Sequence, residues 1–386
     1  MHDFLDIHDS SLFRHGEELC GDQVRLVQAG DRTIAILSDG LGSGVKACIL
    51  ATLTSQIIAT MLGAEAPLDE VLSTVIGTLP MCKVREIAYA TFTVVEVNQV
   101  TLEVRVINFD NPPILYLKAG HPAKLQHRVE KILDRDVIIS EGRLERGDFL
   151  AALSDGVLHA GLGGAMNFGW GRDNVLKFTE QTMLHNPGSA RAIVTRVLNE
   201  VNRLYHDEPG DDATIMGVYV RARKSLMVFT GPPLKEEDDR GACDKLFAFA
   251  GRRVVCGGTT TNIVGNYLGM TIEADISTMR RNLPPVGYVK DVDLLTEGIL
   301  TMARTLEIMR EVKGDITRLP EDRNGAVLLA TELLEADYIE FLVGQSISEY
   351  YQNPLLPRNI SIRVSLVKEV VEFLREVRKE VVVDYI

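Results

Sequence analysis

Short apolar segments separated by polar turns dominate the first half of the chain. Residues 23–29 (QVRLVQA) and 32–38 (RTIAILS) are rich in strand-forming side chains and flank Gly30-Asp31, a pair typical of hairpin turns. A similar pattern recurs at residues 87–97 and 100–107, around Asn98-Gln99. Further strands are predicted at residues 114–118, 148–154 and 213–221.

Helical spacing interrupts these strands. Between Ser43 and Leu62, apolar residues recur in steps of four, so we expect a long helix that other elements cover on more than one side. Its apolar positions are Val45, Ile49, Leu53, Ile57 and Met61. Further helices are predicted near residues 67–78, 173–185 and 189–206. Strand pairs on both sides of long helices indicate an α+β sandwich and not alternating βαβ units.

The pattern changes after Arg223. Strand-like residues 226–230 precede a Gly-Pro-Pro turn, and residues 252–258 and 359–364 each precede a predicted helix. A chain of 386 residues is also long for a single hydrophobic core. We therefore expect two domains, the sandwich at residues 1–222 and a smaller α/β domain at residues 223–386.

Composition narrows the class of protein. A content of 46% hydrophobic and 25% charged residues is typical of globular domains, and the net charge of −13 argues against nonspecific binding to nucleic acid or to an anionic membrane. The five cysteines form no CxxC pair. The N-terminus lacks the pattern of a signal peptide, and no uncharged apolar run reaches the roughly 20 residues of a membrane span. We expect a reduced, cytoplasmic protein.

One motif occurs twice at the end of an apolar strand. AILSDGLGSG (35–44) and AALSDGVLHAG (151–161) both place Ser-Asp-Gly there. A strand followed by a tight turn is the simpler interpretation, because Asp-Gly is common in turns. Two copies favour a second interpretation, in which each strand end holds a carboxylate rigidly at the rim of a sheet. A phosphate loop is disfavoured, because residues 39–44 lack a Gly-Lys-Ser/Thr ending.

Two more acidic clusters lie beside predicted strands. Asp211 and Asp212 come directly before the strand at 213–221, and Asp22 comes directly before the strand at 23–29. None of the four clusters has a histidine or cysteine with the spacing of a metal ligand. Carboxylate oxygens favour Mg²⁺ or Mn²⁺ over zinc, and two such ions about 4 Å apart can activate a water and hold a phosphoryl group.

The ordered set of motifs resembles a known enzyme family. Gly-Asp, Asp-Gly-x-Gly-x-Gly, Gly-Asp-x-x-x-x-x-Ser-Asp-Gly and Asp-Asp-x-Thr follow one another within residues 1–222. This order resembles the metal-dependent protein serine/threonine phosphatases of the PP2C (PPM) superfamily, in the sporulation stage II protein E (SpoIIE-like) branch. The resemblance implies a PP2C-like β-sandwich flanked by helices. It also implies hydrolysis of phosphoserine or phosphothreonine on a bacterial regulatory protein, by a water that two metal ions activate.

The resemblance also assigns roles to single residues. It implies that Asp39 bridges two Mn²⁺ or Mg²⁺ ions, with the carbonyl of Gly40 on one of them. Asp155 and Asp211 would complete the coordination of the second ion, so that Asp39, Asp155 and Asp211 form the catalytic set. Asp22 matches the first acidic position, as a ligand directly or through a water. Asp212 would support the ligands from behind.

Other residues near the motifs leave alternatives open. Relatives often carry Ala-Gly-His-x-Pro-Pro after a central strand, where this chain reads Asn-Phe-Asp-Asn-Pro-Pro at 108–113, so substrate recognition is expected to differ. His159 is a candidate general acid or a polar surface residue. Trp170, within the glycine-rich residues 161–171, belongs either to a mobile flap beside the active site or to an ordinary surface loop.

The second domain shows no recognisable catalytic set. A glycine-rich turn enters a predicted helix and forms either a phosphate- or nucleotide-binding site or a plain helix cap. Its candidate ligand-binding residues are Gly257, Gly258, Thr259, Thr260 and Asn262. The domain is expected to be regulatory, binding a small molecule or a protein, and a homodimer is an open alternative. Two other functions stay open, a phosphatase-like binding module with little turnover and a nucleotide-responsive regulator.

Overall fold

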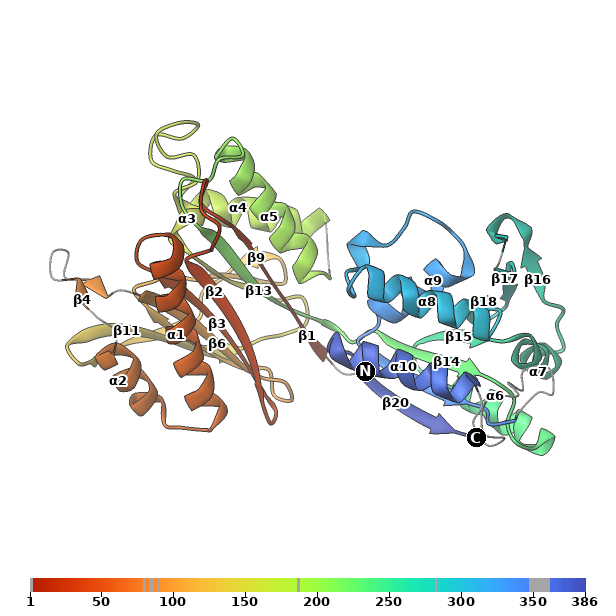
Figure 1. Ribbon diagram of the computed structural model, residues 1–386. Helices are drawn as coiled ribbons and strands as arrows, with labels where there is room; N and C mark the ends of the chain where they lie inside the picture. The colour runs from red at the N-terminus through yellow and green to blue at the C-terminus, as the bar shows by residue number, and fades with distance from the viewer. Residues whose placement is uncertain are drawn as a thin grey trace. The chain divides into compact units, whose positions relative to one another are not determined.

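The computed structural model describes residues 3–78, 81–82, 87–88, 90–185, 188–281, 283–346 and 362–386. Contacts within the chain divide it into two compact units, Met1–Ala222 and Arg223–Ile386 (Figure 1). The division falls where the sequence pattern changes character, and each unit is described by itself.

Within the described residues, the first unit contains two antiparallel sheets packed face to face (Figure 1). One has the strand order β1-β13-β12-β8-β9 and the other the order β10-β11-β7-β6-β3-β2. The strands are β1 (Asp3–Leu12), β2 (Asp22–Ala29), β3 (Arg32–Gly40), β6 (Ala90–Asn98), β7 (Glu103–Phe109), β8 (Leu115–Lys118), β9 (His121–Pro122), β10 (Gln126–Ile132), β11 (Arg135–Arg143), β12 (Phe149–Leu153) and β13 (Ala213–Ala222), beside the short pair β4 (Met81–Cys82) and β5 (Ile87–Ala88).

Helices cover the outer faces of both sheets. α1 (Gly44–Gly63) and α2 (Leu68–Thr78) share a core with β3, β6 and β7. α3 (Asp155–Leu158), α4 (Arg172–His185) and α5 (Ala190–Leu204) share another with β8, β12 and β13. Between the sheets, apolar side chains such as Leu37, Val95, Leu150 and Val218 form a third core. The unit is the predicted α+β sandwich, with a helical layer on each side.

The long helix α1 differs from the expectation. Val45, Ile49 and Leu53 are 62%, 53% and 55% exposed, so the prediction that this apolar stripe is covered is wrong for its first three positions. Ile57 and Met61 at its other end pack partly buried against the core. The helix packs instead through a neighbouring face that includes the small residues Ala47 and Ala51, which allow a close approach to the sheet. By length and composition alone α1 could span a membrane, a property that buried helices of soluble proteins share.

The predicted hairpins are confirmed, and several strands were not predicted. Ala29 pairs with Arg32 across the first turn, and β6 pairs with β7 across the second. Sequence reasoning missed β1, which pairs with β13 along its whole length, and the hairpin of β10 and β11.

The second unit is built on a mixed sheet. In its described residues the strand order is β16-β17-β18-β15-β14-β19-β20, and the pairs from β18 to β20 are parallel. In chain order those five strands follow the 3-2-1-4-5 arrangement of a doubly wound α/β fold. The strands are β14 (Ser225–Thr230), β15 (Arg252–Cys256), β16 (Glu273–Asp275), β17 (Val286–Val289), β18 (Val292–Thr296), β19 (Tyr338–Val343) and β20 (Glu380–Tyr385).

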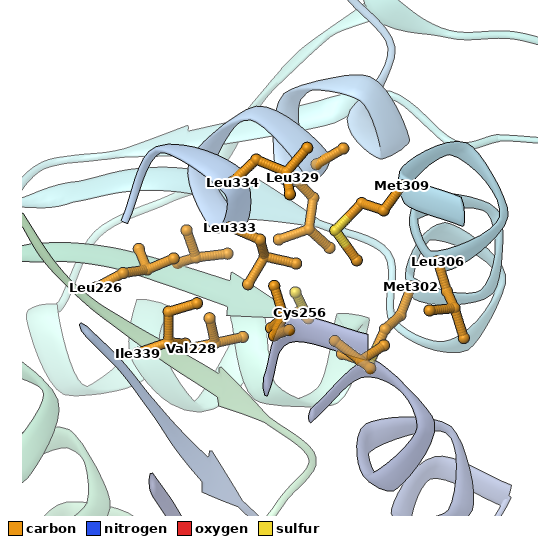
Figure 2. Packing of buried hydrophobic residues seen from close by; sticks show 14 of the residues in the cluster. Leu226, Val228, Cys256, Met302, Leu306, Met309, Leu329, Leu333, Leu334 and Ile339 are labelled. Atoms are coloured by element: carbon orange, nitrogen blue, oxygen red, sulfur yellow. The ribbon is translucent and has the colours of Figure 1, made fainter. Parts of the chain in front are cut away.

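Helices lie on both faces of this sheet. α6 (Asp239–Ala248) and α7 (Gly258–Leu268) cover one face. α8 (Ile299–Glu311), α9 (Gly325–Glu335) and α10 (Ile362–Glu376) cover the other, where Leu226 and Val228 of β14 pack near Leu333 of α9 and Met309 of α8 (Figure 2). Short 3-10 turns lie at η1 (Glu236–Asp238), η2 (Ile276–Thr278) and η3 (Ile316–Arg318).

The last predicted strand of this unit needs a correction. Residues 362–364 begin helix α10, so the strand expected at 359–364 is wrong there, and residues 359–361 lie outside the described residues. The smaller α/β domain is otherwise as predicted.

Candidate metal centre

Two of the predicted aspartates lie side by side on neighbouring strands. In the β2–β3 pair Asp22 is directly opposite Asp39, and in the β3–β6 pair Asp39 is directly opposite Thr91. Directly opposed residues of an antiparallel pair point to the same face of the sheet. The short turn between Ala29 and Arg32 sets this register and therefore brings both carboxylates together.

The other sheet supplies the remaining two predicted aspartates, Asp155 and Asp211. Asp155 opens α3 directly after β12, and Asp211 lies two residues before β13. Ser154 joins these segments, because its backbone N–H donates to the carbonyl of Thr214 (3.0 Å) and its Oγ accepts from the N–H of Thr214 (2.8 Å). The antiparallel pairing of β12 with β13 thus places both acids at one end of the five-stranded sheet.

The four carboxylates influence one another electrostatically across the two sheets. Burial, and then the charges of Asp22, Asp155 and Asp211, together raise the pKa of Asp39 to about 9. Burial also raises the pKa of Asp22 to about 7, against hydrogen bonds from Ser154 and Thr214 that lower it. Burial and then the charge of Asp155 raise the pKa of Asp211. Asp22 and Asp39 are therefore neighbours on one sheet, and the charges of Asp155 and Asp211 act on Asp39 from the other.

Asp212 is fixed behind this centre. It is 4% exposed, and its Oδ1 and Oδ2 accept from the backbone N–H of Arg14 (3.0 Å) and of Gly21 (2.8 Å). Both carboxylate oxygens are therefore engaged in holding the segment between β1 and β2, which delivers Asp22. This arrangement suits the supporting role expected for Asp212.

Glycine allows the backbone to close around the acids. A Cβ on Gly40 would lie 2.1 Å from the carbonyl oxygen of Ala47, and one on Gly156 would lie 2.1 Å from that of Asp212. Real Cβ atoms do not approach so closely. The Gly of each Ser-Asp-Gly motif is thus required by backbone packing at the site.

The donor set suits a hard divalent cation. Oδ2 of Asp22 is buried without a hydrogen-bond partner in the part of the chain that the structure describes. Neighbouring carboxylates that raise one another's pKa are stabilised by a cation, and oxygen donors favour Mg²⁺ or Mn²⁺. Over the described ranges, however, no three His, Cys, Asp or Glu side chains already converge in a metal-binding arrangement. The acids are adjacent without forming a closed ligand cage.

A family model decides the relationship of this chain to known proteins. Residues 29–221 match the model of Stage II sporulation protein E (SpoIIE). The chain belongs to the SpoIIE family. The matched residues, half of the chain, are therefore a protein serine/threonine phosphatase domain of the PP2C type. A comparison with curated proteins finds no match.

Solved structures similar to this chain include a PP2C phosphatase domain. One is the PP2C phosphatase domain of SpoIIE from Bacillus subtilis with a fragment of its regulatory domain, at 18% identity, covering 57% of this chain and 64% of that one, with a TM-score of 0.49. The chain therefore spans less than two thirds of that structure.

Two further structures are similar. The RsbU and RsbW domains of a Mycobacterium tuberculosis protein show 17% identity, cover 63% of this chain and 67% of that one, and give a TM-score of 0.46. RsbX in complex with magnesium shows 14% identity, covers 56% of this chain and 95% of that one, and gives a TM-score of 0.42.

The turn that departs from the SpoIIE-family pattern is held beside the centre. The amides of Asn108 and Asn111 both donate to Thr93 Oγ1 (3.1 and 3.0 Å), and Thr91 Oγ1 donates to Asn111 Oδ1 (3.0 Å). Because Thr91 lies opposite Asp39, the two asparagines tie residues 108–113 to the strand next to the metal centre.

Sequence reasoning missed two other side chains at the site. Burial raises the pKa of Asp211, and the positive charge of Arg14 opposes that rise. Tyr205 donates its hydroxyl to the carbonyl of Gly156 (2.7 Å), and burial, then the charges of Asp211 and Asp155, raise its pKa. No sequence pattern pointed to Arg14, because the strand β1 that precedes it was not predicted.

The structure places Trp170 in the core, which neither alternative had predicted. Its side chain is 5% exposed, packs edge-on against Phe178 at 5.5 Å between ring centroids and belongs to the core beneath α4 and α5. Trp170 therefore anchors residues 161–171. His159 is half exposed, with Nδ1 3.9 Å from Asp155 Oδ2, which keeps it near the centre.

The candidate residues of the second unit lie at the start of α7. Gly257 has a φ of 119°, and the helix begins at Gly258. Thr260 is buried, and its Oγ1 accepts from the backbone N–H of Gly231 (2.9 Å), so its hydroxyl joins two strand–helix turns. Thr259 and Asn262 are exposed. A ligand at Gly257, Gly258, Thr259, Thr260 and Asn262 stays a prediction.

Proposed function

We propose that residues 1–222 hydrolyse phosphoserine or phosphothreonine on a regulatory protein, with two Mn²⁺ or Mg²⁺ ions as cofactors. The observation that carries this proposal is the register that places Asp22 opposite Asp39, together with the charges of Asp155 and Asp211 that raise the pKa of the largely buried Asp39. Membership in the SpoIIE family supports the same reaction.

Each residue has a proposed part in this reaction. Asp39, Asp155 and Asp211 would hold the ions together with Asp22 and the carbonyl of Gly40. When bound, such ions lower the pKa of a water and neutralise phosphate oxygens. Asp212 keeps the segment that bears Asp22 in position through its two backbone hydrogen bonds.

Arg14 is the proposed phosphate-holding side chain. Its backbone N–H is fixed to Asp212, its side chain is exposed, and its charge opposes the rise in the pKa of Asp211. A guanidinium presents several donors to phosphate oxygens. It would therefore orient the phosphoryl group at the centre without taking part in the chemical step.

A binding module with little turnover is the competing function. Buried carboxylates that repel one another cost stability unless a cation compensates them. A module that only binds a partner has no need of this cost, so the acid centre favours an active enzyme.

The second unit is proposed to regulate this activity by binding a small molecule. Its 3-2-1-4-5 order is that of doubly wound folds, which bind ligands beyond the carboxyl ends of their strands. A nucleotide or another phosphorylated ligand at the start of α7 fits this expectation.

The experiment that tests the proposed reaction is phosphate release from synthetic peptides by the full chain. With Mn²⁺ or Mg²⁺ we expect release from phosphoserine and phosphothreonine peptides, and with EDTA none. Asp155→Asn and Asp211→Asn should lower the rate at least about 100-fold, because each removes a charged ligand. Asp134→Asn, at an exposed turn, is the matched control. Release that persists in EDTA, or in both ligand variants, would refute the proposal.

A further inference from the structure

Tyr205 lies where the chain segments that carry Asp155 and Asp211 come together. It follows the last residue of α5, and its N–H donates to the carbonyl of Val201 (3.1 Å). Its side chain is partly buried and packs against the core beneath α4 and α5. Beyond this packing, its hydroxyl and its ring each make one specific contact, and the two contacts are to different acid-bearing segments.

The hydroxyl contacts the segment that carries Asp155. It donates to the carbonyl oxygen of Gly156 at 2.7 Å. Gly156 directly follows Asp155, and both belong to the single turn of α3. The Asp155 side chain is 50% exposed, so its position depends more on the backbone that carries it than on packing around the carboxylate. The hydrogen bond from Tyr205 fixes that backbone.

The ring contacts the segment that carries Asp211. A Cβ on Gly210 would lie 3.5 Å from Cε1 of Tyr205, which is an ordinary van der Waals distance, so this glycine lies beside the ring. Gly210 directly precedes Asp211. Two residues with positive φ, His206 (55°) and Asp207 (63°), turn the chain after α5. The loop that begins at Tyr205 therefore returns to pack against the side chain of the same residue.

The two acid-bearing segments also touch each other. A Cβ on Gly156 would lie 2.1 Å from the carbonyl oxygen of Asp212, so the segments meet backbone to backbone. Tyr205 contacts both sides of this junction, with its hydroxyl at Gly156 and its ring at Gly210. One side chain thus holds the immediate neighbours of two proposed metal ligands.

We propose that Tyr205 is a positioning residue that sets the separation of Asp155 and Asp211, and thereby the affinity of the centre for the second metal ion. This inference rests on the proposed phosphatase function with two divalent ions, and it adds a residue on which the binding of one ion depends. Replacing a residue that holds metal ligands in place typically changes metal affinity about 10- to 100-fold. Because the hydroxyl acts through the backbone of Gly156, its removal should weaken metal binding and leave turnover at saturating metal unchanged.

Calorimetry of Mn²⁺ binding to Tyr205→Phe tests this proposal without any turnover. The substitution removes the hydroxyl and keeps the ring, so the variant should fold. After EDTA treatment and dialysis, we expect the unmodified full chain to bind two ions. Tyr205→Phe should bind one of them about tenfold more weakly and the other with unchanged affinity. In p-nitrophenyl phosphate hydrolysis, the Mn²⁺ concentration at half activation should rise by the same factor, with kcat at saturating Mn²⁺ unchanged.

Tyr116→Phe is the matched control. Tyr116 is buried in the same unit and donates its hydroxyl to Asp148 Oδ2 (2.9 Å). Asp148 directly precedes β12, whereas Asp155 lies beyond its other end. The control should lower the melting temperature in EDTA and leave both Mn²⁺ affinities unchanged. If Tyr205 only stabilised the fold, Tyr205→Phe would behave in the same way.

The outcomes separate this proposal from the proposed reaction. Unchanged Mn²⁺ affinities in Tyr205→Phe would overturn the proposal, and so would an equal weakening of both ions, which indicates a general loosening of the centre. If the unmodified chain binds two ions but releases no phosphate from any peptide, the reaction is refuted, and calorimetry still decides on Tyr205. If the unmodified chain binds no Mn²⁺, both are refuted.

Discussion

At the scale of single residues, the repeated Ser-Asp-Gly motif has one physical explanation. In each copy the aspartate belongs to the acid centre, and the following glycine lies where a Cβ would overlap a backbone carbonyl oxygen at 2.1 Å. The serines also repeat a function, because Ser38 Oγ donates to the carbonyl of Thr91 and Ser154 Oγ accepts from the N–H of Thr214. The motif is therefore a device for holding a carboxylate rigidly where two backbones meet.

The first prediction concerns Gly156. Gly156→Ala must separate α3 from β13, so we expect a loss of about 1–3 kcal/mol in the free energy of unfolding, typical of overpacking, and at least a tenfold loss of activity. Urea denaturation and p-nitrophenyl phosphate hydrolysis measure the two effects. Gly241→Ala in α6, where no atom lies within 4 Å of the new Cβ, should leave both unchanged or raise stability slightly. Equal behaviour of the two variants would show that the contact at Gly156 is unimportant.

At the scale of elements, the register of β2 against β3 creates the electrostatic strain of the centre. It places Asp22 opposite Asp39, both largely removed from solvent, and the second sheet adds the charges of Asp155 and Asp211. The pKa of Asp22 rises to about 7 and that of Asp39 to about 9. A carboxyl group with a raised pKa in the folded state stabilises the fold at low pH and loses that contribution as pH rises through the folded pKa.

The second prediction follows from these directions. In EDTA, the melting temperature of the chain should fall as pH rises from about 5 to about 9, since both acids ionise over this range in the folded state. Asp39→Asn should flatten the fall, and saturating Mn²⁺ should reverse it, because a bound cation stabilises the ionised form. Thermal unfolding followed by circular dichroism measures all three. A melting temperature in EDTA that rises steadily to pH 9 would contradict the assigned pKa directions.

Helices and strands that a local sequence pattern defines could be predicted from the sequence, and those that depend on distant pairing could not. The hairpin of β2 and β3 follows from its apolar runs and Gly30-Asp31. The strand β1 mixes polar and apolar side chains without a regular pattern, and its pairing with β13 defines it. The local sequence therefore does not predict it. The apolar steps of α1 suggested a covered face, whereas Val45, Ile49 and Leu53 on that face are exposed and a neighbouring face with Ala47, Ala51, Ile58 and Leu62 makes the contact.

At the scale of the whole molecule, the acid centre was within reach of sequence reasoning because each aspartate sits at a strand end with a distinct motif. Arg14 was not, since its position depends on how distant segments meet around Asp212. In the second unit the alternation of strands and helices predicted an α/β domain. Its doubly wound strand order emerges only from the pairing of β14 with β19, which are far apart along the chain.

The central claim is that the strand-edge aspartates form a divalent-metal centre that hydrolyses phosphoesters. Its most direct test is p-nitrophenyl phosphate hydrolysis by the full chain, titrated with Mn²⁺ after treatment with EDTA, beside Asp39→Asn and the control Asp134→Asn. We predict saturable activation by Mn²⁺ in the unmodified chain and the control, and activity at least about 100-fold lower in Asp39→Asn at every Mn²⁺ concentration. Unchanged activity of Asp39→Asn, or activity that needs no divalent ion, would contradict the account.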